Sequence, residues 1–62
     1  MADFTVENHG SIALVRPATA RAAEWIAENV EDAMYFGDAL ACEPRYVEDL
    51  VAGMVSDGLE LG

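Results

Sequence analysis

The most regular pattern of apolar and polar positions runs from Glu43 to Gly58 and predicts an α-helix. Pro44 suits the first helical position, with Glu43 before it at the N-cap, where negative charge favours the helix dipole. Gly58 suits the residue just past the end, because glycine readily adopts the left-handed conformation. The apolar face is expected to comprise Val47, Leu50, Val51, Met54 and Val55. The solvated side is expected to carry Glu48, Asp49, Ala52 and Ser56.

The chain before residue 18 predicts a β-hairpin. Phe4–Glu7 alternates apolar and polar residues, as a half-buried strand does. Ser11–Val15 is a second strand, and its more continuous apolar character favours a central position in the sheet. Between the two strands, Asn8-His9-Gly10 predicts a turn because Asn and Gly tolerate positive φ. Pro17 cannot donate to a ladder and is expected to close the second strand.

A second helix is predicted over Ala20–Val30, which is rich in alanine and has Thr19 as a suitable N-cap. Its buried stripe is expected to comprise Ala23, Ile26, Ala27 and Val30, with Trp25 and Ala22 beside it. Glu24, Glu28 and Glu31 are spaced i, i+4 and i+7, which predicts a row of acid along one helical face. Arg21, one turn before Glu24, relieves this repulsion by only a few tenths of a kcal/mol.

The middle of the chain predicts further strand structure. Glu31-Asp32 is expected to break the first helix, and Ala33–Phe36 and Ala39–Cys42 have strand propensity. Gly37-Asp38 between them fits either a bulge in one bent strand or the turn of a second hairpin. Leu59–Leu61 predicts a short final strand with both leucines inward.

The predicted fold class is therefore α+β, in one domain over residues 1–62. We expect a small, mainly antiparallel sheet with two helices on one face, in the order ββαβ(β)αβ. The other face of the sheet is expected to be thinly covered.

Charge is the dominant feature of the composition. Three arginines and no lysine stand against twelve carboxylates, which gives a net charge of −9 in 62 residues. Nucleic acids and anionic membranes are also negative, so neither is an expected partner. A basic protein surface is the natural complement. The acidity has a plainer interpretation as well, because net charge far from zero keeps a protein in solution.

The sequence holds no pattern of residues typical of catalysis. We expect no enzyme activity, no cofactor and no metal site; His9 is interpreted as a polar turn residue. Cys42 lies in an apolar run and is expected to be a buried, inert thiol. The aromatic residues are expected mainly in the core, and they are Trp25, Tyr35, Phe36 and Tyr46. No signal peptide and no membrane-spanning stretch are predicted, so a location in the bacterial cytoplasm is expected. The protein is also expected to be a monomer.

Four short motifs spread along the chain carry a resemblance. They are Asn8-His9-Gly10-Ser11-Ile12, Pro17 before an alanine-rich helix containing Trp25, Glu43-Pro44-Arg45-Tyr46-Val47, and Asp57-Gly58-Leu59. From Phe4 to Leu61 the chain resembles a set of small acidic proteins encoded by phages, prophages and mobile elements. In size, acidity and α/β pattern it is similar to some phage-encoded anti-CRISPR proteins that inhibit type I surveillance complexes.

The resemblance implies an inhibitor that docks on a basic nucleic-acid-binding surface of the Cascade complex and blocks target DNA, as a DNA mimic. No contact residues follow from it. The charge pattern alone gives the candidate partner-binding residues, which are Glu24, Glu28, Glu31, Asp32, Glu48 and Asp49. The alternative function is a small acidic regulatory or adaptor protein that binds another host protein, such as a transcription component.

Overall fold

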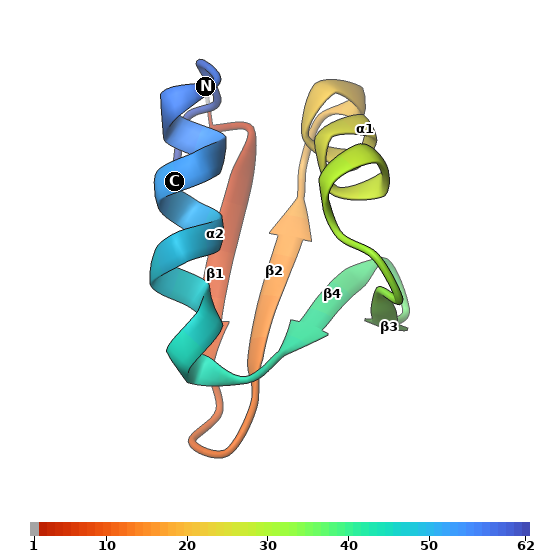
Figure 1. Ribbon diagram of the computed structural model, residues 1–62, viewed down its shortest axis with the longest axis vertical. Coiled ribbons are helices and arrows are strands. Elements are labelled where there is room, and N and C mark those ends of the chain that lie inside the picture. Colours follow the sequence, from red (N-terminus) through yellow and green to blue (C-terminus); the bar gives the residue numbers. More distant parts are fainter. Residues whose placement is uncertain (1) are drawn as a thin grey trace.

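A computed structural model describes residues 2–62 as a four-stranded sheet with two helices (Figure 1). In chain order the elements are β1 (Phe4–Asn8), β2 (Ala13–Pro17), α1 (Ala20–Asn29), β3 (Met34–Phe36), β4 (Ala39–Cys42) and α2 (Pro44–Ser56). The order of strands across the sheet is β1-β2-β4-β3, and all three pairings are antiparallel. The predicted α+β class is confirmed, and β2 is central as expected.

The strand register decides which side chains face the core. Val15 in β2 lies opposite Val6 in β1 and opposite Leu40 in β4, and Leu40 in turn lies opposite Tyr35 in β3. Paired residues point to the same face of a sheet. That face therefore carries the buried side chains of Val15 and Leu40, together with Phe4 at the start of β1.

The buried core joins this sheet face to both helices. Its members are Phe4, Val15, Ala22, Ile26, Leu40, Met54 and Leu59. Ala22 and Ile26 come from α1, Met54 comes from α2, and Leu59 follows α2. Helix stability in so short a chain comes chiefly from packing an amphipathic face, so these contacts hold the two helices in place.

The buried stripe of α1 differs from the predicted one. Ala22 and Ile26 are buried and Trp25 is half-buried, whereas Ala23 and Ala27 are exposed. An orientation that covers both Trp25 and Ile26 removes far more apolar area from water than one that covers two alanines. The N-cap prediction is confirmed, because the Thr19 hydroxyl oxygen accepts from the Ala22 N–H at 3.3 Å.

Helix α2 begins and ends where the sequence predicts. Gly58 has a φ of 92°, and its N–H donates to the Val55 carbonyl at 3.0 Å. The Leu59 N–H donates to the Met54 carbonyl at 3.0 Å, which completes a Schellman motif. Glu43 is the N-cap residue as predicted, and its side chain forms no cap bond. One detail of the prediction is wrong, because Val55 was expected on the apolar face and is 51% exposed.

The second strand begins two residues later than predicted, at Ala13. The turn before it is longer, because the His9 N–H donates to the Ile12 carbonyl at 2.8 Å. Gly10 in that turn has a φ of 83°. Pro17 is tolerated as the last residue of β2 because β4 pairs only with Ala13–Val15, so no ladder bond is needed on that side.

The structure also decides between a bulge and a turn at Gly37-Asp38, and it tests the strand predicted at Leu59–Leu61. Gly37-Asp38 forms the turn of a second hairpin, with a φ of 61° at Gly37. The predicted strand at Leu59–Leu61 is wrong, since only an isolated parallel bridge joins Leu61 to Phe4. Leu59 is buried, but Leu61 is 48% exposed.

We predict that Gly58→Ala lowers the free energy of unfolding by about 1–2 kcal/mol, the usual cost of a left-handed residue with a Cβ. Space is not the reason, because a Cβ there would meet its nearest neighbour, Arg21, at an ordinary 3.6 Å. Gly58→Asn is the matched control and should lose less, since Asn tolerates this conformation. Urea denaturation of the three proteins measures the difference. Equal stability of the alanine variant and the wild type would contradict the assigned cap.

Candidate protein-binding surface

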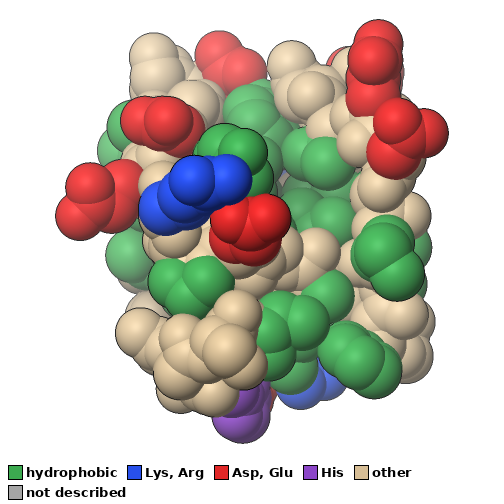
Figure 2. All heavy atoms as spheres, turned by 60° about the horizontal axis from the view of Figure 1, so that its bottom comes forward, with side chains coloured by type: hydrophobic (Ala, Val, Ile, Leu, Met, Phe, Trp, Pro, Cys, Tyr) green, Lys and Arg blue, Asp and Glu red, His purple; other side chains and the backbone are tan. Residues whose placement is uncertain are grey.

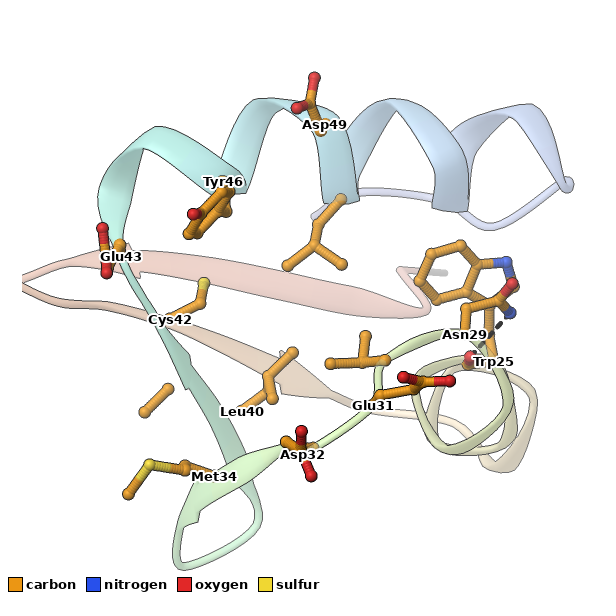
Figure 3. Close-up of a pocket in the computed structure, with 14 residues that line it drawn as sticks. Trp25, Asn29, Glu31, Asp32, Met34, Leu40, Cys42, Glu43, Tyr46 and Asp49 are labelled. Carbon is orange, nitrogen blue, oxygen red and sulfur yellow. Dashed lines mark hydrogen bonds between the residues drawn. The ribbon is translucent and has the colours of Figure 1, made fainter.

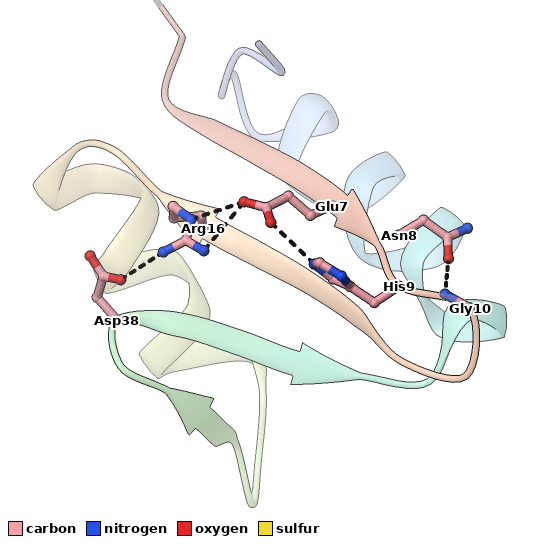
Figure 4. Close-up of polar contacts among 6 residues, drawn as sticks. All are labelled: Glu7, Asn8, His9, Gly10, Arg16 and Asp38. Atoms are coloured by element: carbon pink, nitrogen blue, oxygen red, sulfur yellow. Dashed lines mark hydrogen bonds and ion pairs between the residues drawn. The ribbon is translucent and has the colours of Figure 1, made fainter.

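Arg16 is the centre of a polar network on the sheet. Arg16 in β2 lies 3.3 Å from Glu7 and 3.1 Å from Asp38, which joins the two hairpins (Figure 4). His9 lies 3.1 Å from the other oxygen of Glu7. The hydrogen bonds from His9 and then Arg16 lower the pKa of Glu7. By strand alternation, Glu7 and Arg16 point away from the core face that holds Val6 and Val15.

The other two arginines are also engaged. The guanidinium of Arg21 donates to the Gly58 carbonyl at 2.8 Å, so it supports the end of α2 and does not reach Glu24 as expected. Arg45 lies 2.8 Å from Glu43, and its guanidinium carbon sits 5.0 Å from the ring centroid of Tyr46. All three cations are therefore committed to contacts within the fold.

Some of the acidic side chains are structural as well. Asp3 accepts from the Glu60 N–H at 2.9 Å and from the Thr19 hydroxyl at 2.8 Å. These two bonds, in that order, lower the pKa of Asp3. They favour the folded state while Asp3 is ionised, and their contribution is lost as the pH falls through the lowered pKa. Asp57 accepts a hydrogen bond from the Trp25 indole N–H, which ties α1 to the end of α2.

The predicted partner-binding residues have no such role. Their side chains are all exposed, and within residues 2–62 none of their carboxylates forms an ion pair or a side-chain hydrogen bond. They are Glu24, Glu28, Glu31, Asp32, Glu48 and Asp49. A carboxylate left free by the fold is available to a partner without breaking an internal contact. Charge reasoning from the sequence thus selected side chains that the fold does not use.

The predicted acidic row on α1 is shorter than expected. Helix α1 ends at Asn29, the next residue is extended, and Asp32 takes a φ of 54°. Only Glu24 and Glu28 therefore share a helical face, and Glu31 belongs to the turn that follows. Val30 leaves the helix to join the partly buried residues around the core, and this carries Glu31 out of the row.

The structure instead brings Glu31 and Asp32 to the edge of a groove. The groove encloses about 560 Å³ and lies between α2 and the end of α1 with the turn that follows it (Figure 3). Its apolar lining includes Val30, Ala33, Met34, Leu40, Ala41, Cys42 and Leu50. Glu43 and Asp49 line it on the α2 side. Figure 2 shows a hollow of hydrophobic side chains with acidic side chains on either side of it.

The candidates thus fall into two sets. Glu31, Asp32 and Asp49 line the groove, whereas Glu24, Glu28 and Glu48 lie outside it. Glu24 and Glu28 are close instead to Arg21 and Trp25, around a shallower depression on α1. Glu31, Asp32 and Asp49 therefore belong to the largely apolar groove, and Glu24 and Glu28 belong to a separate surface on α1.

Sequence reasoning missed the apolar part of this surface. Tyr46 lines the groove and is 50% exposed, and the three residues of β3 are exposed by 73% at Met34, 49% at Tyr35 and 64% at Phe36. These aromatic residues were expected mainly in the core. Strand propensity located β3 but not its position at the sheet edge, where no helix covers it.

Cys42 also differs from its prediction. The thiol is half-buried and lines the groove, where a fully buried residue was expected. Cys42 lies on the core face of β4, opposite Ala13, and the groove exposes that end of the strand. Burial raises the pKa of the thiol, which favours its neutral form.

Comparison of the chain with known protein families, with curated proteins and with solved structures finds no match. Within residues 2–62 no three His, Cys, Asp or Glu side chains are arranged to hold a metal ion. Neither helix in that range has the length and apolar character needed to cross a membrane. The features of the molecule that bear on function are therefore its exposed acidic side chains and the groove.

We predict that the melting temperature rises between about 10 mM and about 300 mM NaCl, because salt screens the repulsion among unpaired carboxylates. At the lower concentration the screening length is about 30 Å, which exceeds the longest dimension of the molecule, 28 Å. Glu24→Gln/Glu28→Gln/Glu48→Gln should show a smaller rise, measured by thermal denaturation. A flat melting temperature for the wild type would contradict dominant self-repulsion.

Cys42 provides a second test. Because the thiol is half-buried and its pKa is raised, N-ethylmaleimide should alkylate the native protein more slowly than the urea-unfolded protein. The native rate should keep rising with pH beyond about 8.5, the ordinary pKa of a cysteine. Mass spectrometry follows a single adduct, since the chain has one cysteine. Equal rates for native and unfolded protein would contradict the described environment.

Proposed function

We propose that this protein is a non-enzymatic binding module whose acidic surface occupies a basic surface of another protein. The observation that carries the proposal is the set of six exposed carboxylates that have no partner within residues 2–62, while the three arginines are engaged in other contacts. A partner with lysines and arginines would supply the missing counter-charge. Complementary charge speeds the encounter between two proteins and selects against partners of the same sign.

In its most concrete form, the partner is a type I CRISPR effector complex and the occupied surface is one that holds nucleic acid. Resemblance to small acidic phage and mobile-element proteins supports this choice of partner. A basic groove that holds DNA accepts closely spaced negative charge, since duplex DNA carries one charge per about 1.7 Å of axis. Glu24 and Glu28, at i and i+4 on α1, offer such a pair on one helical face, and Glu48 and Asp49 add acid on α2. Bound there, the protein would exclude target DNA.

One observation favours a second candidate, an adaptor that binds a basic segment of a host protein such as a transcription component. The groove combines an apolar lining with the acidic residues Glu31, Asp32 and Asp49. A pure imitation of phosphates has no use for exposed apolar surface. Contiguous apolar patches rimmed by polar residues are typical of sites where another protein docks.

We predict that the protein lowers the binding of target DNA to a purified type I effector in a gel-shift assay. Three variants remove the candidate charges in pairs: Glu24→Gln/Glu28→Gln, Glu31→Gln/Asp32→Asn and Glu48→Gln/Asp49→Asn. At least one pair should weaken inhibition about tenfold or more, because a close charge pair at an interface contributes about 1.5 kcal/mol or more. Circular dichroism checks that each variant is folded.

The matched control is His9→Lys/Ser11→Lys, which raises the net charge by the same two units with His9 neutral. Both positions lie in the β1–β2 turn, at the opposite end of the molecule from α1 (Figure 1). The control should inhibit as the wild type does. If the effector bound DNA equally well in the presence of the protein, the proposal that the partner is a type I effector would be wrong. If every paired variant inhibited as well as the control, the hypothesis that particular carboxylates bind the partner by complementary charge would be wrong.

A further inference from the structure

The floor of the groove is formed by a strand, β4, that is paired on both sides at its centre. β4 pairs with β2 on one side and with β3 on the other, and Leu40 and Ala41 have cross-strand partners in both neighbours. The backbone of this strand is therefore occupied within the sheet. An extended peptide could not add to β4 and would leave its own N–H and C=O groups unpaired over an apolar floor, which is costly.

The two walls of the groove carry charge of the same sign. Glu31 and Asp32 lie in the turn that follows α1. On the α2 side, Glu43 lies at the start of the helix, and the Asp49 carboxylate lies on the outer side of α2 and points away from the cavity (Figure 3). Glu43 is paired with Arg45, whereas the carboxylates of Glu31, Asp32 and Asp49 have no partner within residues 2–62. An occupant is therefore favoured if it carries positive charge on both flanks and apolar side chains between them.

We propose that the groove binds an α-helix of a partner protein, with an apolar stripe toward β4 and lysines or arginines on both flanks. A helix satisfies its backbone hydrogen bonds internally, so it can lie on an apolar floor without adding to a sheet. Cys42 and Leu50 would contact the stripe, and the acidic residues at the groove edge would meet the flanks. This inference rests on the proposed function and specifies the form of the partner.

A second copy of this chain is a poor occupant. Each copy carries a net charge of −9, and its three arginines are engaged with Glu7, Asp38, Glu43 and the Gly58 carbonyl. Neither helix of the chain has the basic flanks that the groove requires. Two copies placed groove to helix would oppose acid with acid.

A designed peptide tests the inference directly. The probe is an 18-residue, fluorescein-labelled peptide with leucines at i, i+3, i+4 and i+7 spacing, lysines on both flanks and alanine elsewhere. One control peptide has the same composition in scrambled order. A second control keeps the leucines and lysines but has proline at its centre, which breaks the helix. Fluorescence anisotropy in about 0.15 M NaCl, where surface charges are screened beyond about 8 Å, gives the dissociation constants.

Two matched variants of the protein locate the site. Glu31→Gln/Asp32→Asn/Asp49→Asn removes three charges from the groove, and Glu24→Gln/Glu28→Gln/Glu48→Gln removes three from outside it. Asparagine at position 32 is compatible with the positive φ there. The groove variant should bind the helical peptide about tenfold more weakly, and the outer variant less than about threefold more weakly. The helical peptide should also slow alkylation of Cys42 by N-ethylmaleimide.

Equal affinity for the helical, scrambled and proline-containing peptides would overturn the inference, as would equal losses in the two variants or an unprotected Cys42. Those results would show charge attraction without docking in the groove, and the proposed function would stand if the protein still displaced DNA from the effector. Conversely, the protein could bind the helical peptide specifically and have no effect on the effector. That result would support helix binding in the groove and would exclude the type I effector as the partner.

Discussion

The small number of positive charges determines which acidic side chains of this protein remain exposed and unpaired. Three arginines serve twelve carboxylates, and each arginine is placed where it also holds the fold together. Arg16 joins the two hairpins, and Arg21 supports the carbonyl that follows α2. Glu7, Asp38 and Glu43 pair with arginines, whereas Asp3 and Asp57 accept hydrogen bonds from Thr19 and Trp25. The acid available to a partner is therefore what these internal contacts leave unpaired within residues 2–62.

The groove has a separate origin, in the uneven cover of the sheet. The helices pack their buried residues against Phe4, Val15 and Leu40, which come from β1, β2 and the first half of β4. The second half of β4, at Ala41 and Cys42, and the edge strand β3 receive less cover. A short chain does not bury all of its apolar surface. The uncovered part lies beside the turn that holds Glu31 and Asp32, so apolar and acidic surfaces become neighbours.

Much of the fold could be predicted from local signals in the sequence. Thr19, Pro44 and Gly58 have backbone requirements that are independent of the rest of the chain, and they located the helix ends correctly. The orientation of α1 could not be predicted in this way, because alanines lie on both possible faces and Trp25 decides between them only through tertiary packing. The candidate carboxylates were found from charge alone, but their division between groove and outer surface required the helix end at Asn29. The exposure of Phe36 depends on the position of β3 at the edge of the sheet, which no local pattern reports.

The edge strand β3 has one further consequence, for the solubility of the protein. Natural edge strands avoid pairing with other chains through lysines, prolines, bulges or very short length. β3 is short, at three residues, but Met34, Tyr35 and Phe36 are apolar or aromatic and exposed. Only the repulsion between like-charged molecules opposes edge-to-edge association over a longer range. The excess acid therefore protects an otherwise adhesive sheet edge, and this protection disappears in acidic solution, where the carboxylates become neutral.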